Sequence, residues 1–553
     1  MKTKSFLFSM LFLAAILVGC EKPQTQTGQE GETNSYITVA VKSSVASRAA
    51  TDTVADGGYI TGTDAENAIT SIDFYFFATT GEPFKFNSPV SNNTTSAYSN
   101  LYTVGTRELD EFNGTMNVEE VAKVTLALQH NLGDYPGSVV AIVNGTQRFE
   151  NLPIEDFRTH TFNSYQTTKG FLMSNSVYKD PASGKEIFQT PIKPENFTLT
   201  KEAALANPID IYVERSAVRV EVAQGTADTK FDTGVLLFGS KKVYAKITGW
   251  DIVTVPNHAY TVKRIDINWP DQINGFTWNK STDFRSFWAD AQFPADSIVK
   301  SFKYSDLTNP VGLGKYDYCL ENTTLPIYTE VGGVHDQVAS RTNTTKVVIA
   351  ADLVDDANQP VEVANWYGKD YLLEDLKIAV ANSLKDKMFY GEGGGWKSIK
   401  PEQIKLVQGS GLPGEEESYE IYFQLTDEAT NNYNWAEDLD GNVGISSDKE
   451  QDYIRKNVEV AKFWNGKSYY IVDIQHLGKK EMDGTTYLPA YYGTVRNHAY
   501  QITFSAVKGL GTPVYSELQD IPEPIKPDDT ESFIEAEINV LSWHLIQQNV
   551  TLQ

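Results

Sequence analysis

The chain has 553 residues, 41% of them hydrophobic and including 29 Tyr and 27 Phe, which is the composition of a globular protein with room for roughly two to four domains. It carries 72 acidic and 47 basic residues, and the resulting net charge of −25 excludes nucleic acid as a natural partner. Because only two cysteines occur, a framework of disulfides is excluded as well.

Residues 1–19 have the pattern of an export signal. Two lysines precede an apolar run from Phe6 to Val18, which is too short to be a spanning helix. The run ends in the sequence Leu-Val-Gly-Cys, which resembles a bacterial lipobox, in which Cys20 is acylated and becomes the first residue after signal removal. We therefore expect a lipoprotein precursor.

Residues 20–48 are predicted to be a lipidated propeptide that ends in a strand. A polar tether comes first, and then Ile37, Val39 and Val41 alternate with smaller or polar residues, as in a half-buried strand. The strand is followed by Arg48 in a small-residue stretch of the kind that proteases enter. The expected cut falls between Arg48 and Ala49.

Strand signals dominate the middle of the chain. Short alternating or apolar runs bounded by turn residues recur up to residue 507, and a domain boundary near residue 214 divides them into predicted domains at 49–214 and 215–519. One helix is predicted at 371–388, where Leu373, Leu376, Val380 and Leu384 share a face.

The end of the chain, residues 520–553, is predicted to be a linker followed by a strand. The linker, 520–532, holds three prolines and five acids and cannot lie in a central strand. Beyond it, one long strand with a bulge or break near position 541 is expected over 533–552. Its apolar positions are Ile534, Ala536, Ile538, Val540, Leu541, Trp543 and Leu545.

We find no catalytic site, cofactor site or metal site in the sequence. Cys319 lies in an apolar run and is expected to be a small buried side chain. The seven histidines lack the spacing of metal ligands, and no nucleophile elbow occurs. Two possibilities stay open: paired carboxylates of the glycosidase type, and calcium near the loop from Asp438 to Asn442.

Several segments together resemble the type V pilus fimbrillins of Bacteroidales, most closely the shaft subunit of the short (minor) fimbria. The matching pieces are 17–20, Arg48 with its small neighbours, 171–175 (FLMSN), 213–219 (VERSAVR), 318–323 (YCLENT) and 493–500 (GTVRNHAY). They span nearly the whole chain.

This resemblance implies a mainly β fold with two β-sandwich-like, transthyretin-like domains and a few short helices. It also implies an outer-membrane lipoprotein precursor, cleavage by a trypsin-like Arg-specific protease, and assembly into a surface fimbria by donor-strand exchange. In that exchange, the strand with Ile37, Val39 and Val41 is removed, and residues 533–552 of an identical subunit fill the groove that it leaves. The implied role is adhesion, co-aggregation and biofilm formation, with anchor and tip subunits and host or bacterial receptors as partners.

Four other functions are weighed against a shaft subunit. A tip or accessory fimbrial adhesin is the nearest alternative, and an anchor subunit is disfavoured because it would keep its lipid. A surface carbohydrate-binding lipoprotein or a lipid-anchored hydrolase would also be β-rich and acidic. Neither would need a strand ahead of a cleavable arginine, or a strand after a proline-rich linker.

Overall fold

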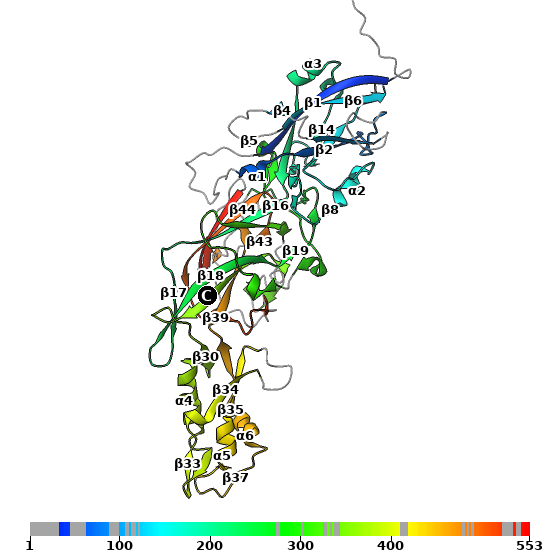
Figure 1. Ribbon diagram of the computed structural model, residues 1–553. Coiled ribbons are helices and arrows are strands. Elements are labelled where there is room, and N and C mark those ends of the chain that lie inside the picture. The colour runs from blue at the N-terminus through cyan, green and yellow to red at the C-terminus, as the bar shows by residue number, and fades with distance from the viewer. Residues whose placement is uncertain are drawn as a thin grey trace, which may run out of the picture.

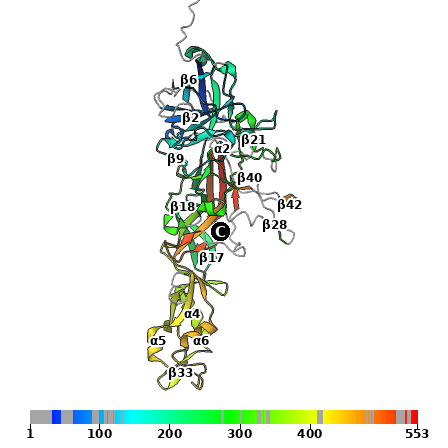
Figure 2. The same cartoon turned by 90° about the vertical axis from the view of Figure 1, so that its right-hand side faces the viewer.

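The computed structural model is elongated, and three groups of elements follow one another along its long axis (Figures 1 and 2). It describes residues 32–44, 62–87, 99–105, 110–111, 118–119, 122–131, 133–271, 277–299, 302–323, 329–331, 334–336, 343–409, 418–477, 482–483, 486–487, 491–521, 535–537 and 544–552. Within these ranges, no helix is long and apolar enough to cross a membrane.

The first group is built on a ten-stranded sheet with the order β3-β2-β7-β11-β15-β1-β6-β4, in which β14 also pairs with β7 and β5 with β1. The bounds are β1 (Glu32–Ser44), β2 (Ser71–Phe77), β3 (Leu101–Gly105), β4 (Asp110–Glu111), β5 (Val118–Glu119), β6 (Ala122–Asn131), β7 (Ser138–Val143), β11 (Met173–Asn175), β14 (Thr190–Pro191) and β15 (Ile209–Arg215). Three short helices belong to this part: α1 (Asp64–Asn67), α2 (Ile154–Thr159) and α3 (Lys201–Ala206).

Both faces of this sheet are covered, which explains why all seven residues of β2 are buried. Phe74 and Phe76 of β2 join an apolar cluster that also receives side chains from β1, β3, β6, β7, β11 and β15. The sheet therefore curves around one core. Tyr75 and Phe77, which alternate with these residues along the strand, join a second cluster on the other face.

The second group is a sandwich of two five-stranded sheets. The first sheet has the order β25 (Tyr316–Leu320), β16 (Ala217–Gln224), β44 (His498–Val507), β48 (His544–Leu552), β47 (Glu535–Glu537). The second has the order β17 (Phe231–Leu236), β18 (Lys242–Val253), β29 (Lys346–Val354), β39 (Lys467–Asp473), β45 (Thr512–Pro513). One cluster joins Val220 and Ile502 of the first sheet to Trp250 and Ile349 of the second, so the core lies between them.

The third group, which we call the distal unit, is inserted between β29 and β39 and lies at the far end from the first sheet (Figure 1). Its own apolar cluster includes Leu376, Val380, Phe423 and Trp435. Its elements are β30 (Val363–Trp366), β31 (Lys369–Leu372), α4 (Leu373–Leu384), β32 (Phe389–Glu392), β33 (Gly395–Ser398), β34 (Ile404–Gln408), β35 (Glu420–Leu425), α5 (Asp427–Asn432), β36 (Trp435–Ala436), β37 (Gly444–Ile445), α6 (Glu450–Asn457) and β38 (Ala461–Trp464).

The prediction of a mainly β fold is confirmed. The predicted helix is α4, with Leu376, Val380 and Leu384 buried as expected. The chain changes sheets at Ser216, between β15 and β16, next to the predicted boundary at residue 214. The sequence pattern does not separate the distal unit from the rest of 215–519, and a division into two domains stays a proposal.

Candidate strand-exchange site

The predicted removable strand is β1, and it lies inside the first sheet rather than at its edge. On one side it pairs in parallel with β15, from Val39↔Ile209 to Ser43↔Val213. On the other side it pairs antiparallel with β6, from Glu32↔Asn131 to Ala40↔Lys123. The backbone of β1 is therefore hydrogen-bonded on both sides, and β5 is a third partner at Ser43 and Ser44.

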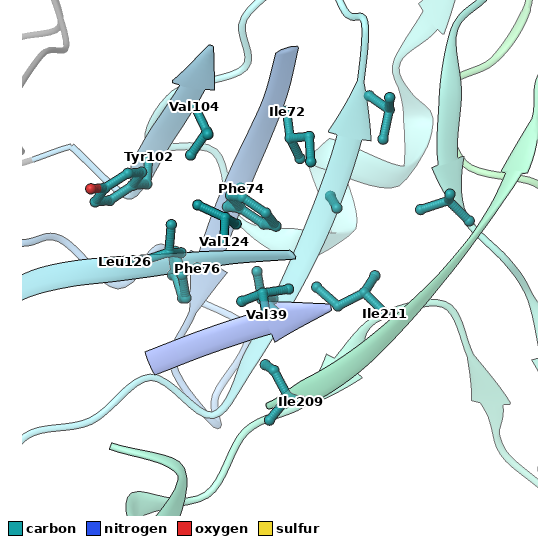
Figure 3. Packing of buried hydrophobic residues seen from close by; sticks show 14 of the residues in the cluster. Val39, Ile72, Phe74, Phe76, Tyr102, Val104, Val124, Leu126, Ile209 and Ile211 are labelled. Atoms are coloured by element: carbon teal, nitrogen blue, oxygen red, sulfur yellow. The ribbon is translucent and has the colours of Figure 1, made fainter. Parts of the chain in front are cut away.

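The side chains of β1 that the structure describes are part of the core. Ile37 and Val39 are both 0% exposed. Figure 3 shows Val39 among Val124 and Leu126 of β6 and Ile209 of β15. Burial of two such side chains contributes about 1.5–3 kcal/mol each, before any ladder hydrogen bonds are counted.

Loss of β1 would change the first sheet in a specific way. The facing edges of β15 and β6 would lose their partners, and backbone groups without partners are costly unless another strand supplies them. The apolar cluster to which Ile37 and Val39 belong would also be exposed to solvent at the place that these side chains fill. The vacated position is thus shaped to accept an extended segment with apolar residues at alternate positions.

The C-terminal segment differs from the single long strand that the sequence predicts. β48 pairs in parallel with β44, from His498↔His544 to Val507↔Leu552. β47 pairs antiparallel with β48, from Glu535↔Thr551 to Glu537↔Asn549, so the chain reverses between the two strands. The change of apolar phase near 541, from which a bulge or break is predicted, fits a reversal equally well. The end of the chain is also not detached, because β48 completes the sandwich sheet.

The structure describes only some of the predicted site residues. Ile37, Val39 and Val41 lie together in β1, and Ala536 and Leu545 lie in β47 and β48. The remaining predicted residues lie outside the described residues: Cys20, Arg48, Ala49, Ile534, Ile538, Val540, Leu541 and Trp543. The lipidation site, the cleavage site and most of the donor positions therefore stay predictions.

A buried polar joint connects the first sheet to the sandwich, and its central residue is not among the residues predicted from the sequence. Glu66 of α1 is fully buried, and its carboxylate accepts a hydrogen bond from the Tyr318 hydroxyl at 2.6 Å. The signal that was available is the pattern Thr63-x-x-Glu66, a capping box, which the structure confirms. The side chain of Arg215, at the end of β15, reaches both α1 and Asn497.

Two further ion pairs are buried close to this joint. Lys263 Nζ lies 2.7 Å from Glu214 Oε2, and both side chains are 0% exposed. Burial lowers the pKa of Lys263 and raises that of Glu214, and the ion pair opposes both shifts. Arg496 donates to Glu321 through its Nε at 3.1 Å and its backbone N–H at 3.0 Å. Such pairs hold the joint in one arrangement, since separating either pair would leave a buried charge without its partner.

The lone cysteine has the environment that the sequence predicts. Cys319 is 4% exposed and lies in the core of the sandwich. Burial raises the pKa of its thiol, which disfavours the reactive thiolate. We assign it a packing role.

A cleft of about 560 Å³ lies beside the joint, between residues 163–168 and strands β18 and β25. Asp251 and Asp317 line it, and the Asn309 amide donates to both carboxylates, at 3.3 and 3.0 Å. Burial, together with the nearby Asp317 and Asp306 carboxylates, raises the pKa of Asp251 to about 6.

Asp251→Asn is expected to stabilise the protein at pH 7 and to leave its stability at pH 3.5 nearly unchanged. Because the folded-state pKa is raised, the stability contribution of Asp251 is complete below pH 3.8 and is lost as the pH rises through about 6. After allowance for solvent screening, the expected gain at pH 7 is about 1 kcal/mol. Thermal unfolding at both pH values checks this, with the exposed Asp296→Asn as a charge-matched control. An equal shift at both pH values would contradict the account.

Among the described residues, no group of three or more His, Cys, Asp or Glu side chains is arranged to hold a metal ion. In the loop considered for calcium, the Asp438 carboxylate accepts backbone N–H groups of Asp440, Asn442 and Val443 at 2.7–2.9 Å. These hydrogen bonds, first that from Asn442, lower the pKa of Asp438. The loop is thus organised by its own backbone.

Comparison with known proteins gives one family match. Residues 461–549, from β38 into β48, match the family model described as "Major fimbrial subunit protein type IV, Fimbrillin, C-terminal". No curated protein sequence matches the chain.

Solved structures of fimbrial proteins are similar only at a distance. A fimbrilin (FimA) from Porphyromonas gingivalis W83 is 12% identical with a TM-score of 0.32, over 94% of this chain and 97% of that one. The tip fimbrial protein Mfa3 from Porphyromonas gingivalis, with a C-terminal truncation, is 10% identical with a TM-score of 0.26, over 59% of this chain and 78% of that one. A fimbrial assembly protein from Parabacteroides distasonis is 11% identical with a TM-score of 0.28, over 58% and 82%.

Scores this low carry no argument about function, and the family model matches residues 461–549 alone. That model covers β44 and most of β48, the last described strand, which pairs with β44 in parallel. The match over 461–549 shows that this part of the chain is similar to the C-terminal part of fimbrillins, which are major fimbrial subunits, in agreement with the motifs that resemble Bacteroidales type V pili.

Proposed function

We propose that this protein is a fimbrillin, the shaft subunit of a short-type fimbria, and that it polymerises by protease-triggered donor-strand exchange. The observation that carries the proposal is the place of β1, which is hydrogen-bonded on both sides within the first sheet and contributes Ile37 and Val39 to its core. A strand in that place keeps the sheet closed in the precursor. Its removal would open a groove for another subunit.

In the proposed sequence of events, the precursor reaches the outer membrane through acylated Cys20. An Arg-specific protease then cuts between Arg48 and Ala49, in the stretch that connects β1 to α1. The released β1 leaves, and residues 533–552 of an identical subunit enter the groove. The entering strand regains ladder hydrogen bonds on both sides and buries its alternate apolar side chains.

The pairing of β48 with β44 adds a requirement to this scheme. Before the C-terminal segment can enter another subunit, β48 must leave the parallel ladder that it forms with its own sheet. The groove therefore has to offer at least the interactions that β44 gives up. The C-terminal segment would therefore leave β44 only when an open groove is available to accept it. Few donor strands would be free at any time, and free strands are the ones that would aggregate.

A shaft position follows from having both halves of the exchange in one chain. A subunit with a groove and a donor segment can bind one neighbour at each end and so extend a filament without limit. The resulting filament would support adhesion to host or bacterial surfaces, co-aggregation and biofilm formation, with separate anchor and tip subunits at its ends.

N-terminal sequencing of the subunit from purified surface filaments tests the proposal. We expect the mature chain to begin at Ala49 and to lack lipid. Immunogold labelling in the electron microscope is expected to decorate the filament along its length. Label at one end only would indicate a tip or accessory subunit, and a subunit that begins at a lipidated Cys20 would contradict the proposed maturation.

A further inference from the structure

We propose that residues 62–71, the first described stretch after the predicted cut at Arg48, act as a clamp that holds the processed chain on the joint when β1 leaves. This inference rests on the proposed function only in assuming that β1 departs after the cut. The clamp itself is a set of contacts in the structure, and these contacts are made by elements other than β1.

The carboxylate of Glu66 is the centre of the clamp. It is 0% exposed and is held by Tyr318 Oη at 2.6 Å, by the backbone N–H of Thr63 at 2.5 Å and by Arg219 Nη1 at 3.5 Å. A buried carboxylate is tolerated only with partners of this kind. Arg219 lies on β16 and Tyr318 on β25, so the carboxylate joins the leading segment of the first group to the sandwich sheet.

Arg219 is itself fixed in place. Its guanidinium lies 3.8 Å from the centre of the Tyr316 ring and 4.0 Å from Glu221. Its side chain is only 8% exposed. The cation that faces Glu66 is therefore held by the sandwich, independently of α1.

The backbone of the clamp is held from two more directions. Arg215 Nε donates to the carbonyl of Glu66 at 2.9 Å, and the same guanidinium contacts Asn497 at the start of β44. Asn144, in the turn after β7, accepts the N–H of Thr70 at 2.9 Å and donates to the carbonyl of Ala68 at 2.8 Å. Arg215 lies on β15, which keeps its pairing with β11 when β1 departs, and Asn144 directly follows β7, which does not pair with β1.

This arrangement has a role at the moment of processing. β2 begins at Ser71, the last residue of the clamp, and is buried along its whole length. A new chain end created at Ala49 tends to fray inward, because unpaired ends gain conformational entropy. The clamp stops fraying before β2, so that processing opens the position of β1 alone and leaves the groove walls in place. Glu66 is in this sense a positioning residue.

Hydrogen exchange on the full chain tests the clamp. The variants are Glu66→Ala, the milder Tyr318→Phe, and Asp64→Asn as a control that changes one exposed charge in the same helix. Exchange of the peptide covering 62–77 is measured by mass spectrometry, before and after cleavage with an Arg-specific protease. We expect cleavage to leave this peptide protected in the wild type and in the control.

In Glu66→Ala, the amides of Asn67 and Thr70 are expected to exchange roughly tenfold faster in the intact chain. After cleavage, the loss of protection should spread into β2. Tyr318→Phe should give a smaller change in the same peptide, which keeps the test valid if Glu66→Ala does not fold. Equal exchange in Glu66→Ala and the wild type, or loss of protection in the cleaved wild type, would overturn the clamp. If β1 stays bound after cleavage, the proposed function is wrong. The comparison of Glu66→Ala with the wild type before cleavage still tests whether the clamp contacts hold residues 62–71.

Discussion

Cells whose precursor carries Arg48→Ala are expected to form no filaments from this subunit. Without the cut, β1 stays covalently attached and keeps its place between β15 and β6. An intramolecular strand competes with a free donor at a high effective concentration, so the groove stays closed. Electron microscopy of surface filaments and the mass of the surface-exposed chain check this result, which should be a loss of filaments rather than a shortening.

Arg48→Lys is the matched control for this experiment. It keeps the positive charge but removes the side chain that an Arg-specific protease requires. The purified precursor of Arg48→Lys should therefore assemble only after brief treatment with trypsin, which accepts lysine, and Arg48→Ala should not assemble under the same treatment. Filaments of normal length from untreated Arg48→Ala cells would show that cleavage at this position is not the trigger.

Deletion of residues 533–553 is expected to leave a folded subunit that cannot extend a filament. β44 would lose its neighbour β48, so the melting temperature should fall by roughly a few degrees, with unfolding still cooperative. Under the proposed scheme, the truncated protein would have a groove after processing but no donor segment. When it is mixed with wild-type subunits, it should bind at one end of growing filaments and stop their extension there. The mean filament length should fall as the fraction of truncated subunits in the mixture rises.

The double substitution Ile538→Asp and Val540→Asp separates the two effects of that deletion. It keeps β48 and places two charges where the donor segment is expected to enter an apolar groove, at a cost of several kcal/mol if they stay unpaired. We expect near-normal monomer stability and no extension. Filaments of normal length from either protein would show that the C-terminal segment is not the polymerising element.

The sequence predicted β1 and α4 because their signals are local. Ile37 and Val39 alternate along one strand, and Leu376, Val380 and Leu384 recur on one helical face. Neither pattern says which segments become neighbours. β1 lies beside β15, which comes about 170 residues later in the chain, and that pairing depends on the whole first sheet.

Three features were beyond local patterns. The distal unit has the same strand signals as the sandwich, and only the direct pairing of β29 with β39 shows that it is an insertion. The reversal between β47 and β48 has the same apolar phase change as a bulge. Glu66 stood in a recognisable capping box, but its burial is set by Arg219 and Tyr318, far away in the sequence.

The insertion of the distal unit also decides how a filament would bear a pulling force. The chain leaves the sandwich after β29 and returns at β39, and the two connecting points are direct neighbours: the backbone N–H of Leu353 donates to the carbonyl of Gly466 at 2.9 Å, and Asp352 pairs with Lys467. Tension across the sandwich therefore passes through the ladder between these strands and bypasses residues 355–465. In such a filament the distal unit would lie outside the direct path of the force, and only its contacts with the sandwich, such as the cluster of Leu353, Val363 and Trp464, would sense the strain.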